Sequence, residues 1–144
     1  MSRGLPQESL GFLVADLARR MRGAFAQQLE GSGLTLAQAR ALLHVAQHEG
    51  MRQVELSERL EVQPITLARL VDQLERSGLV ERRADPQDGR AHRIFLTRAS
   101  GPHLTTIERV AAAIRKQALQ GIGKQDVVLV TAALRTMRKN LLTS

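Results

Sequence analysis

A chain of 144 residues has room for one domain with extensions, because compact domains commonly hold about 100 to 200 residues, and this excludes a second large catalytic domain from it. Aromatic residues make up only 2% of the composition, which favours a core of Leu, Val, Ile and Ala packed between helices. The absence of cysteine excludes disulfides, thiolate metal sites and thiol oxidation, and the net charge of +7 favours a polyanionic partner.

The first expected element is one long amphipathic helix over residues 7–29. Its apolar residues recur at steps of three and four, which places them on one helical face. No apolar run with a small-residue cleavage site precedes it, and no stretch approaches the roughly 18 apolar residues of a membrane span. We therefore expect a cytoplasmic protein with no membrane partner. The apolar face consists of Leu10, Leu13, Val14, Leu17, Ala18, Met21, Ala24 and Phe25.

A second helix is expected after a break at residues 31–33. Thr35 is placed to cap its first turn, and Gly50 is its expected stop. His44 and His48 lie four residues apart on this helix, a spacing at which two imidazoles can share a metal ion. A structural or solvent-facing pair is the alternative. Because no cluster of further ligands stands nearby in the sequence, we predict no metal site.

A helix-turn-helix is expected next, with its first helix over residues 54–60 and its turn over residues 61–63. Pro64 opens the second helix, where the missing N–H of proline costs nothing and its fixed φ is already helical. Gly78 is the expected end of that helix. The buried stripe of the second helix consists of Leu67, Leu70, Val71, Leu74 and Leu79.

The opposite face of the second helix is unusual for a solvated surface, because Ile65 stands there beside Thr66. An apolar side chain can contact a thymine methyl in the major groove, and Arg69 can reach a guanine edge or a phosphate. The structural alternative packs Ile65 against a neighbouring helix and pairs Arg69 with Asp72.

A β-hairpin is expected to follow, with strands over residues 80–83 and 93–97 and the loop ADPQDGRAH between them. In this loop the carboxylate of Asp88 is expected to hold the guanidinium of Arg90, although a solvated pair is the alternative. An arginine held at a hairpin tip fits a narrow minor groove. Helix, turn, helix and hairpin in this order predict a mainly α fold with a small β-wing, a winged helix-turn-helix whose partner is double-stranded DNA.

Two more amphipathic helices are expected over residues 102–142, with Gly121 and Gly123 between them. The winged helix-turn-helix alone is expected to bury neither apolar stripe, so we expect a symmetric homodimer, with packing into a monomer as the alternative. Residues 102–144 hold seven Lys and Arg against two Asp and Glu, which suits either a polyanion or a solvated helix face. The stripes consist of Ile107, Val110, Ala111, Ile114 and Ala118, and of Val127, Val130, Leu134, Met137 and Leu141.

The chain resembles the MarR family of transcriptional regulators, and within it the SlyA-like branch. The resemblance spans nearly the full length and is strongest in ELSERLEV, PITLARLVDQLERSGLV and the wing sequence DPQDGRAHRIFLT. In the wing, Asp88, Arg90 and the closing Leu96-Thr97 keep the family's usual spacing. The resemblance implies a triangular homodimer with interlocked N- and C-terminal helices, in which two winged helices read a palindrome.

The resemblance also implies roles for single residues, because Pro64 and Thr66, together with Arg69, match the family's major-groove contacts and Arg90 matches its minor-groove arginine. SlyA-like wings often carry basic residues where this chain has Gly89, His92 and Phe95. We therefore expect fewer phosphate contacts and a shallower salt dependence of binding. The residues expected at DNA are Arg52, Gln53, Gln63, Pro64, Ile65, Thr66, Arg69, Gln73, Asp88, Gly89, Arg90 and Arg93.

The expected organisation is a single MarR-type domain over residues 1–144. The winged helix-turn-helix occupies residues 35–98, with the wing at about 80–97, and the dimerisation helices occupy residues 7–30 and 102–142. The expected function is sequence-specific regulation of transcription by a homodimer on a palindromic operator.

An effector is the least determined part of this expectation. The resemblance implies a crevice for a small aromatic or phenolic anion, toward which Arg19, Arg20 and Arg22 are either carboxylate partners or ordinary solvated side chains. No Tyr or Trp is present to stack on such a ligand. A nucleoid-type architectural or anti-silencing protein without a ligand is therefore the alternative.

An enzyme is not expected, and neither is a cofactor. The chain lacks a Gly-rich phosphate loop with a Lys, a Gly-x-Ser-x-Gly elbow, a Cys nucleophile and a recognisable pair of catalytic acids.

Overall fold

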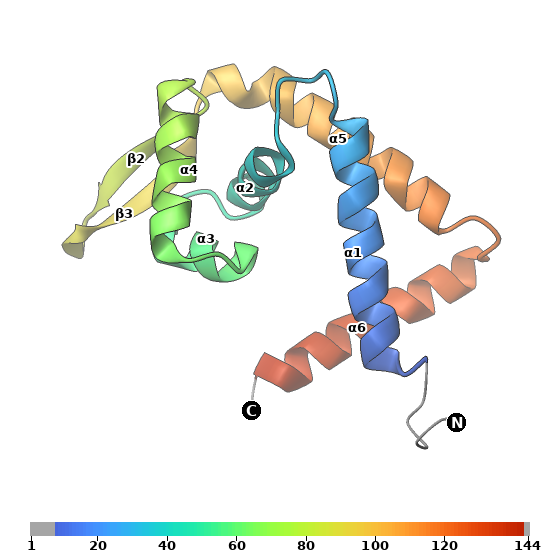
Figure 1. Ribbon diagram of the computed structural model, residues 1–144. Helices are drawn as coiled ribbons and strands as arrows, with labels where there is room; N and C mark the ends of the chain where they lie inside the picture. The colour runs from blue at the N-terminus through green and yellow to red at the C-terminus, as the bar shows by residue number, and fades with distance from the viewer. Residues whose placement is uncertain (1–7, 143–144) are drawn as a thin grey trace, which may run out of the picture. The chain divides into compact units, whose positions relative to one another are not determined.

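The computed structural model describes residues 8–142 (Figure 1). Within them, six α-helices and a three-stranded antiparallel sheet confirm the predicted mainly α fold with a small β-wing. The chain divides into two compact units, one ending at Ala111 and the other beginning at Ala112. The elements are α1 (Leu10–Gln28), α2 (Leu36–Gln47), β1 (Met51–Arg52), α3 (Gln53–Leu60), α4 (Pro64–Arg76), β2 (Val80–Asp85), β3 (Asp88–Leu96), a 3-10 turn (Arg98–Ser100), α5 (Gly101–Ala118) and α6 (Lys124–Leu142).

The core of the first unit lies where α2, α3, α4 and the sheet meet. The predicted stripe of α4 is confirmed, since it is buried along its length except at the half-buried Leu70. Truncating one buried leucine of this kind to alanine typically costs about 2–5 kcal/mol, so this core holds the first unit together. The larger apolar side chains of these elements that are at most 2% exposed are Leu42, Val45, Leu56, Leu67, Val71, Leu74, Val80 and Ile94.

The start of α2 is fixed by a reciprocal cap. The Thr35 hydroxyl accepts a hydrogen bond from the Gln38 backbone N–H at 3.1 Å, and the Gln38 side-chain oxygen accepts one from the Thr35 N–H at 3.0 Å. Two amides that the helix itself leaves without acceptors are thereby satisfied. The predicted cap at Thr35 is confirmed.

The prediction that α2 stops at Gly50 is wrong. The helix ends at Gln47, and Gly50, with a φ of +84°, belongs to the entry into the sheet instead. Its N–H donates to the Ile94 carbonyl at 2.9 Å. A side chain here would also meet the ring of Phe95 at 3.1 Å, so both the backbone and the packing favour glycine.

The strands of the wing are longer than predicted. The expected loop over residues 84–92 reduces to Pro86 and Gln87, because β2 and β3 stay paired out to Asp85 opposite Asp88. Antiparallel pairing satisfies the backbone of these residues regardless of their weak strand propensity. The short strand β1 was not predicted, because two residues carry no alternating pattern; it pairs with β3 at Met51 opposite Ile94.

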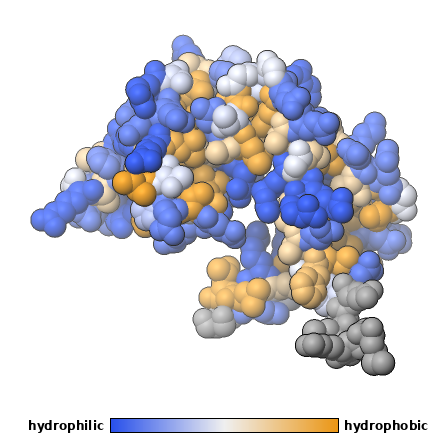
Figure 2. Space-filling view, viewed as in Figure 1, coloured by the Kyte–Doolittle hydropathy of each residue, from blue (hydrophilic) through white to orange (hydrophobic). Residues whose placement is uncertain are grey.

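The apolar stripes of the terminal helices differ in exposure. In α5, Ile107, Val110 and Ile114 are buried within the single chain, so the expectation that this stripe needs a second subunit is wrong. On α1 and α6, large apolar side chains remain exposed, and Figure 2 shows hydrophobic surface at the C-terminal end of α6. The exposed set is Leu10, Phe12, Leu13, Val14, Leu17 and Met21 on α1, and Val128, Leu129, Val130, Leu134, Leu141 and Leu142 on α6.

None of the helices described between residues 8 and 142 is both long enough and apolar enough to cross a membrane.

The end of α4 is closed at Gly78, as predicted. Gly78 has a φ of +75° and donates its N–H to the Glu75 carbonyl at 2.9 Å, while the Leu79 N–H reaches back to the Leu74 carbonyl at 2.9 Å. This pair of bonds is the Schellman arrangement, which turns the chain from the helix into β2.

Replacing Gly78 with alanine should lower the free energy of unfolding by about 1 kcal/mol, because a side chain is strained at positive φ. Added atoms would meet nothing within 4 Å, so the effect isolates the backbone. Urea unfolding followed by circular dichroism measures it. Gly89→Ala, at an equally open position without a positive φ, should stay within about 0.5 kcal/mol of wild type. Equal stability of the two variants would contradict this account.

Candidate nucleic-acid interface

The exposed face of α4 carries side chains that the rest of the described chain does not use. Ile65 is 66% exposed, and Thr66, Arg69 and Gln73 are also exposed. Within residues 8–142 Arg69 makes no ion pair or hydrogen bond, while Asp72 pairs with Arg82 instead. The structural alternative, in which Ile65 packs on a helix and Arg69 pairs with Asp72, is therefore wrong for this chain.

The tip of the wing is built differently from the prediction. The carboxylate of Asp88 accepts a hydrogen bond from the backbone N–H of Arg90 at 3.1 Å and does not hold its guanidinium. The bond fixes the turn of the main chain, as short acidic side chains often do. The Arg90 side chain is exposed and has no partner among the described residues, and Figure 2 shows the wing tip as a hydrophilic projection.

A groove joins the start of α3, the start of α4 and the wing. It has a volume of about 200 Å³, and Pro64 of α4 and Arg90 of β3 both line it. The two elements predicted to read DNA therefore border one concave surface, although they lie far apart in the sequence. The remaining lining residues are Arg52, Gln53, Val54, Ser57, Leu67, Ala91 and His92.

Two arginines predicted at DNA lie at a buried carboxylate in the wing. The side chain of Asp85 is fully buried, and its Oδ2 lies 2.8 Å from Arg52 Nε and 3.4 Å from Arg93 Nε. Arg93 also donates from Nη1 to the Gly50 carbonyl at 3.0 Å. These contacts tie β1 and β3 to the end of β2, so both arginines hold the wing in place, with about a third of each side chain left exposed.

The pKa of Asp85 lies below its ordinary value. The main cause is the hydrogen bond that its Oδ1 accepts from the Gln87 backbone N–H at 2.9 Å, and the charges of Arg52 and Arg93 add to it. Each of these favours the ionised form. The carboxylate is therefore held charged inside the wing, where it has partners for its charge.

Arg82 of β2 was missed by sequence reasoning, although it is the most highly connected side chain of the motif. Its Nη1 donates to Asp72 Oδ1 at 2.6 Å and to Glu75 Oε1 at 3.3 Å, and its Nη2 donates to the Ala68 carbonyl at 3.1 Å. Its Nε donates to Gln53 Oε1 at 2.9 Å. The side-chain oxygen of Gln53, a residue predicted at DNA, is therefore already occupied as the acceptor for Arg82. No local pattern in the sequence indicates these partners.

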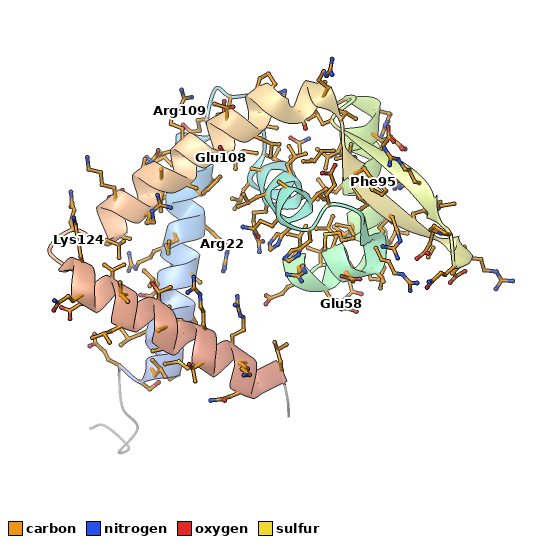
Figure 3. The ribbon with its side chains drawn as sticks, turned by 180° about the vertical axis from the view of Figure 1, so that it is seen from behind. Arg22, Glu58, Phe95, Glu108, Arg109 and Lys124 are labelled. Carbon is orange, nitrogen blue, oxygen red and sulfur yellow. The ribbon has the colours of Figure 1, made fainter. Side chains whose placement is uncertain are left out.

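The neighbouring Arg83 lies over the ring of Phe95, with its guanidinium carbon 3.9 Å from the ring centre. It also pairs with Glu81 on the same strand. Phe95, labelled in Figure 3, comes from β3, so this contact bridges the two wing strands. A stacked arginine of this kind is stabilised by about 0.5–1 kcal/mol at an exposed site and is less available to a phosphate.

The arginines of α1 form local pairs on an exposed surface. Arg20 Nε lies 3.2 Å from Asp16 Oδ2, and Arg19 pairs with the other oxygen of the same carboxylate. These pairs lower the pKa of Asp16, chiefly through the hydrogen bond from Arg19. For these two arginines the arrangement favours the solvated alternative over a carboxylate site.

His44 on α2 and His48 at its C-cap lack the surroundings of a metal site. In the described part of the chain no three or more His, Cys, Asp or Glu side chains are grouped so that they could hold a metal ion. The Nδ1 of His44 is buried and has no hydrogen-bond partner within residues 8–142. Burial lowers the pKa of His44, and the positive charges of Arg40 and Arg59 lower it further.

Comparison with known proteins relates this geometry to one family. A profile of the MarR family matches residues 34–92, from the start of α2 to the wing. The transcriptional regulator PA3341 is 36% identical, and its structure matches with a TM-score of 0.83 over 94% of this chain and 100% of its own. A MarR family regulator from Silicibacter pomeroyi is 28% identical, with a TM-score of 0.80 over 90% of this chain and 88% of its own. MarR is 26% identical, with a TM-score of 0.82 over 99% of this chain and 95% of its own.

Acidification should destabilise the protein through His44. Because the folded pKa lies below the ordinary value of about 6.5, the unfolded chain takes up the proton first. The contribution of neutral His44 to the stability is therefore fully present above about pH 6.5 and is lost as the pH falls toward the folded pKa. Thermal melting between about pH 7.5 and 5 should show a smaller loss of Tm for His44→Gln than for wild type.

His48→Gln is the companion variant, because His48 caps the C-terminal end of α2 with an exposed side chain and its charge contributes to the lowered pKa of His44. Because the charge of His48 is the smallest of the causes that lower the pKa of His44, His48→Gln should reduce the dependence of Tm on pH less than His44→Gln does. A His44→Gln protein with the same dependence as wild type would remove His44 as the cause.

Proposed function

Because the chain belongs to the MarR family of transcriptional regulators, we propose that it acts in the cytoplasm as a homodimer on a palindromic DNA operator. The observation that carries this proposal is the shared groove, in which Pro64 at the start of α4 and Arg90 at the wing line one cavity of about 200 Å³. A helix start and an arginine-bearing hairpin on one surface suit simultaneous contact with a major groove and an adjacent minor groove.

In this proposal α4 enters the major groove. The exposed Ile65 and Thr66 are placed to contact thymine methyl groups, and Arg69, without a partner in residues 8–142, is available to a guanine edge. Gln63 and Gln73, both exposed, flank this face and add amide donors and acceptors. Burying Ile65 against DNA would also remove apolar surface from water.

The wing supplies the minor-groove contact of the proposal. The Asp88 carboxylate fixes the main chain at Arg90, so the guanidinium extends from a defined turn. Gly89 has no neighbouring side chain within 4 Å of where its Cβ would be, and it adds no bulk between the turn and the minor groove of the DNA. Narrow minor grooves attract arginine through their enhanced negative potential, without a unique base code.

The homodimer of the proposal rests on α1 and α6. Each presents large exposed apolar side chains, such as Phe12 at 69% and Leu129 at 66% exposure. Several large exposed apolar side chains on one helix indicate an interaction site, and a symmetric pair is the commonest assembly. We assign residues 1–144 to one MarR-type domain, with residues 35–98 as the winged helix-turn-helix and residues 7–30 and 102–142 as dimerisation segments.

The proposal places the chain in the SlyA-like branch, on the strength of the wing sequence DPQDGRAHRIFLT. A small aromatic or phenolic anion is the proposed class of effector. Titration of salicylate into the protein–DNA complex separates this from a ligand-independent, anti-silencing role. An effector is supported if salicylate releases the DNA at concentrations at which unrelated carboxylates have no effect. Unchanged DNA binding supports the ligand-independent role.

In vitro selection from a random duplex pool should enrich a palindrome with the wild-type protein. Arg69→Ala should lose base preference at fixed positions in both half-sites, equivalent to about 1–3 kcal/mol of discrimination. Arg90→Ala should weaken binding more evenly across sequences. The enriched sequences and their dissociation constants provide both measurements.

Arg76→Ala is a suitable control, because Arg76 is an exposed arginine of α4 that donates to the backbone of its own helix and does not line the groove. It should select the wild-type palindrome. A pool without enrichment would overturn sequence-specific regulation and favour architectural binding, whereas retention of no DNA at all would leave a protein-contact role.

Restoring an arginine at Gly89 should steepen the salt dependence of DNA binding. One added phosphate contact changes the slope of log K against log salt by about −0.9. The position is open, without a positive φ, so Gly89→Arg should fold normally. Dissociation constants at several salt concentrations provide the slope. A steep wild-type slope that the substitution leaves unchanged would show that the wing is not short of phosphate contacts.

A further inference from the structure

Arg82 lies where the wing meets both helices of the helix-turn-helix. Its side chain is only 17% exposed, although the residue carries a full positive charge on a motif expected to bind a polyanion. Among the arginines of the wing it is the one turned furthest from solvent. An arginine directed away from the DNA-facing surface in such a motif requires a role other than phosphate contact.

The contacts of Arg82 join three elements through one planar group. Ala68, Asp72 and Glu75 lie on one face of α4, four and three residues apart, and all three accept hydrogen bonds from its guanidinium. Gln53 brings in the first turn of α3. The Arg82 backbone N–H adds a bond to Glu75 Oε2 at 3.0 Å, so strand β2 itself is attached to α4. We call this set the Arg82 network.

The chemistry of the Arg82 network is specific to arginine. A guanidinium presents five N–H donors in a rigid plane, and four of them are directed at the network's side chains and carbonyl. A lysine ammonium carries the same charge on a flexible stem with three donors, so it cannot reach α3 and α4 in the same fixed geometry. Charge and geometry can therefore be separated by one substitution.

The Arg82 network also determines which group Gln53 presents. Its side-chain oxygen is taken by Arg82 Nε, so the amide nitrogen remains as the donor on a residue that lines the groove beside Pro64 and Arg90. An amide fixed in this sense donates to a phosphate oxygen or a base acceptor. Without Arg82 the amide could rotate, and two carboxylates on α4, Asp72 and Glu75, would lose the cation that balances them.

We propose that Arg82 is a positioning residue for DNA specificity: it locks α3, α4 and the wing into one rigid reading surface and orients the amide of Gln53 toward the groove. This inference rests on the proposed DNA-binding function. Sequence discrimination requires that the α4 side chains contact the major groove of the DNA while Arg90 contacts the minor groove at a fixed spacing. Nonspecific attraction to phosphate depends mainly on charge. Loss of the lock should therefore affect specific binding far more than nonspecific binding.

The test compares Arg82→Lys with Arg83→Lys, a matched change on the adjacent exposed arginine of the same strand. Affinity is measured for the selected palindrome and for a scrambled duplex of equal length. Arg82→Lys should reduce the ratio of the two affinities by about tenfold or more, which corresponds to about 1.4 kcal/mol. Affinity for the scrambled duplex should stay within about threefold of wild type. Arg83→Lys should retain the wild-type ratio.

Hydrogen exchange without DNA keeps the inference testable on its own. In Arg82→Lys the hydrogen-bonded amides of β2 and β3 should exchange faster, while the buried amides of α2 keep their protection and thereby show that the fold persists. Wild-type exchange throughout the wing would overturn the lock. If Lys preserved both the affinity ratio and the wing protection, the charge of Arg82 and not its fork would matter, and the inference would be wrong.

Failure of the proposed function gives a different result. In that case the wild-type protein itself would show no preference between the palindrome and the scrambled duplex, whatever the exchange data say. A preference in wild type that Arg82→Lys leaves intact would overturn the present inference alone. Arg82→Gln provides a second variant: if Arg82 contacts phosphate directly, the slope of log K against log salt on scrambled DNA should lose about one unit, which the positioning role does not predict.

Discussion

The geometry of the winged helix-turn-helix depends on the hydrogen bonds of the Arg82 guanidinium. They join it to α4 through Asp72 and Ala68 and to α3 through Gln53. The apolar core beneath it is close-packed but non-directional, so burial alone draws α4 and the sheet together without fixing the angle between them. Directed hydrogen bonds from one rigid plane supply that angle. The Arg82 network can fix this angle because the groups that Arg82 contacts lie on α3 and α4 and not on β2, the strand that carries the arginine.

A second ionic contact holds the other end of the wing. Asp85 is buried between Arg52 and Arg93, and Arg93 reaches on to the carbonyl of Gly50. Removing one member of a buried pair leaves an uncompensated charge, which is why such contacts resist disruption once they are formed. Arg82 lies toward the base of the hairpin and Asp85 near its tip. The wing is therefore attached at both ends to the rest of the first unit.

These contacts divide the arginines of the motif by role. Those at 52, 82 and 93 are engaged with protein groups, while those at 69 and 90 have no partner within residues 8–142. The net charge of the motif therefore says little about its surface, since much of the positive charge is neutralised inside it. The arginines that remain outward include Arg69 on α4 and Arg90 on the wing, the two elements that border the groove.

The helices of the motif and most of their ends follow from local chemistry that can be read along the chain. The stripe through Leu67 and Leu74, the proline at the start of α4 and the glycine at Gly78 act within a few residues of one another, and each prediction based on them is confirmed. The spacing of the wing motif likewise indicated the family. The partners of Arg82 and Arg93, the strand β1 and the full length of the hairpin did not follow. Gln53 and Arg82 are 29 residues apart and Gly50 and Arg93 are 43 apart, so only folding brings them within hydrogen-bond distance. A periodic pattern specifies which face of an element is buried, but the partner of a polar group depends on the packing of distant elements.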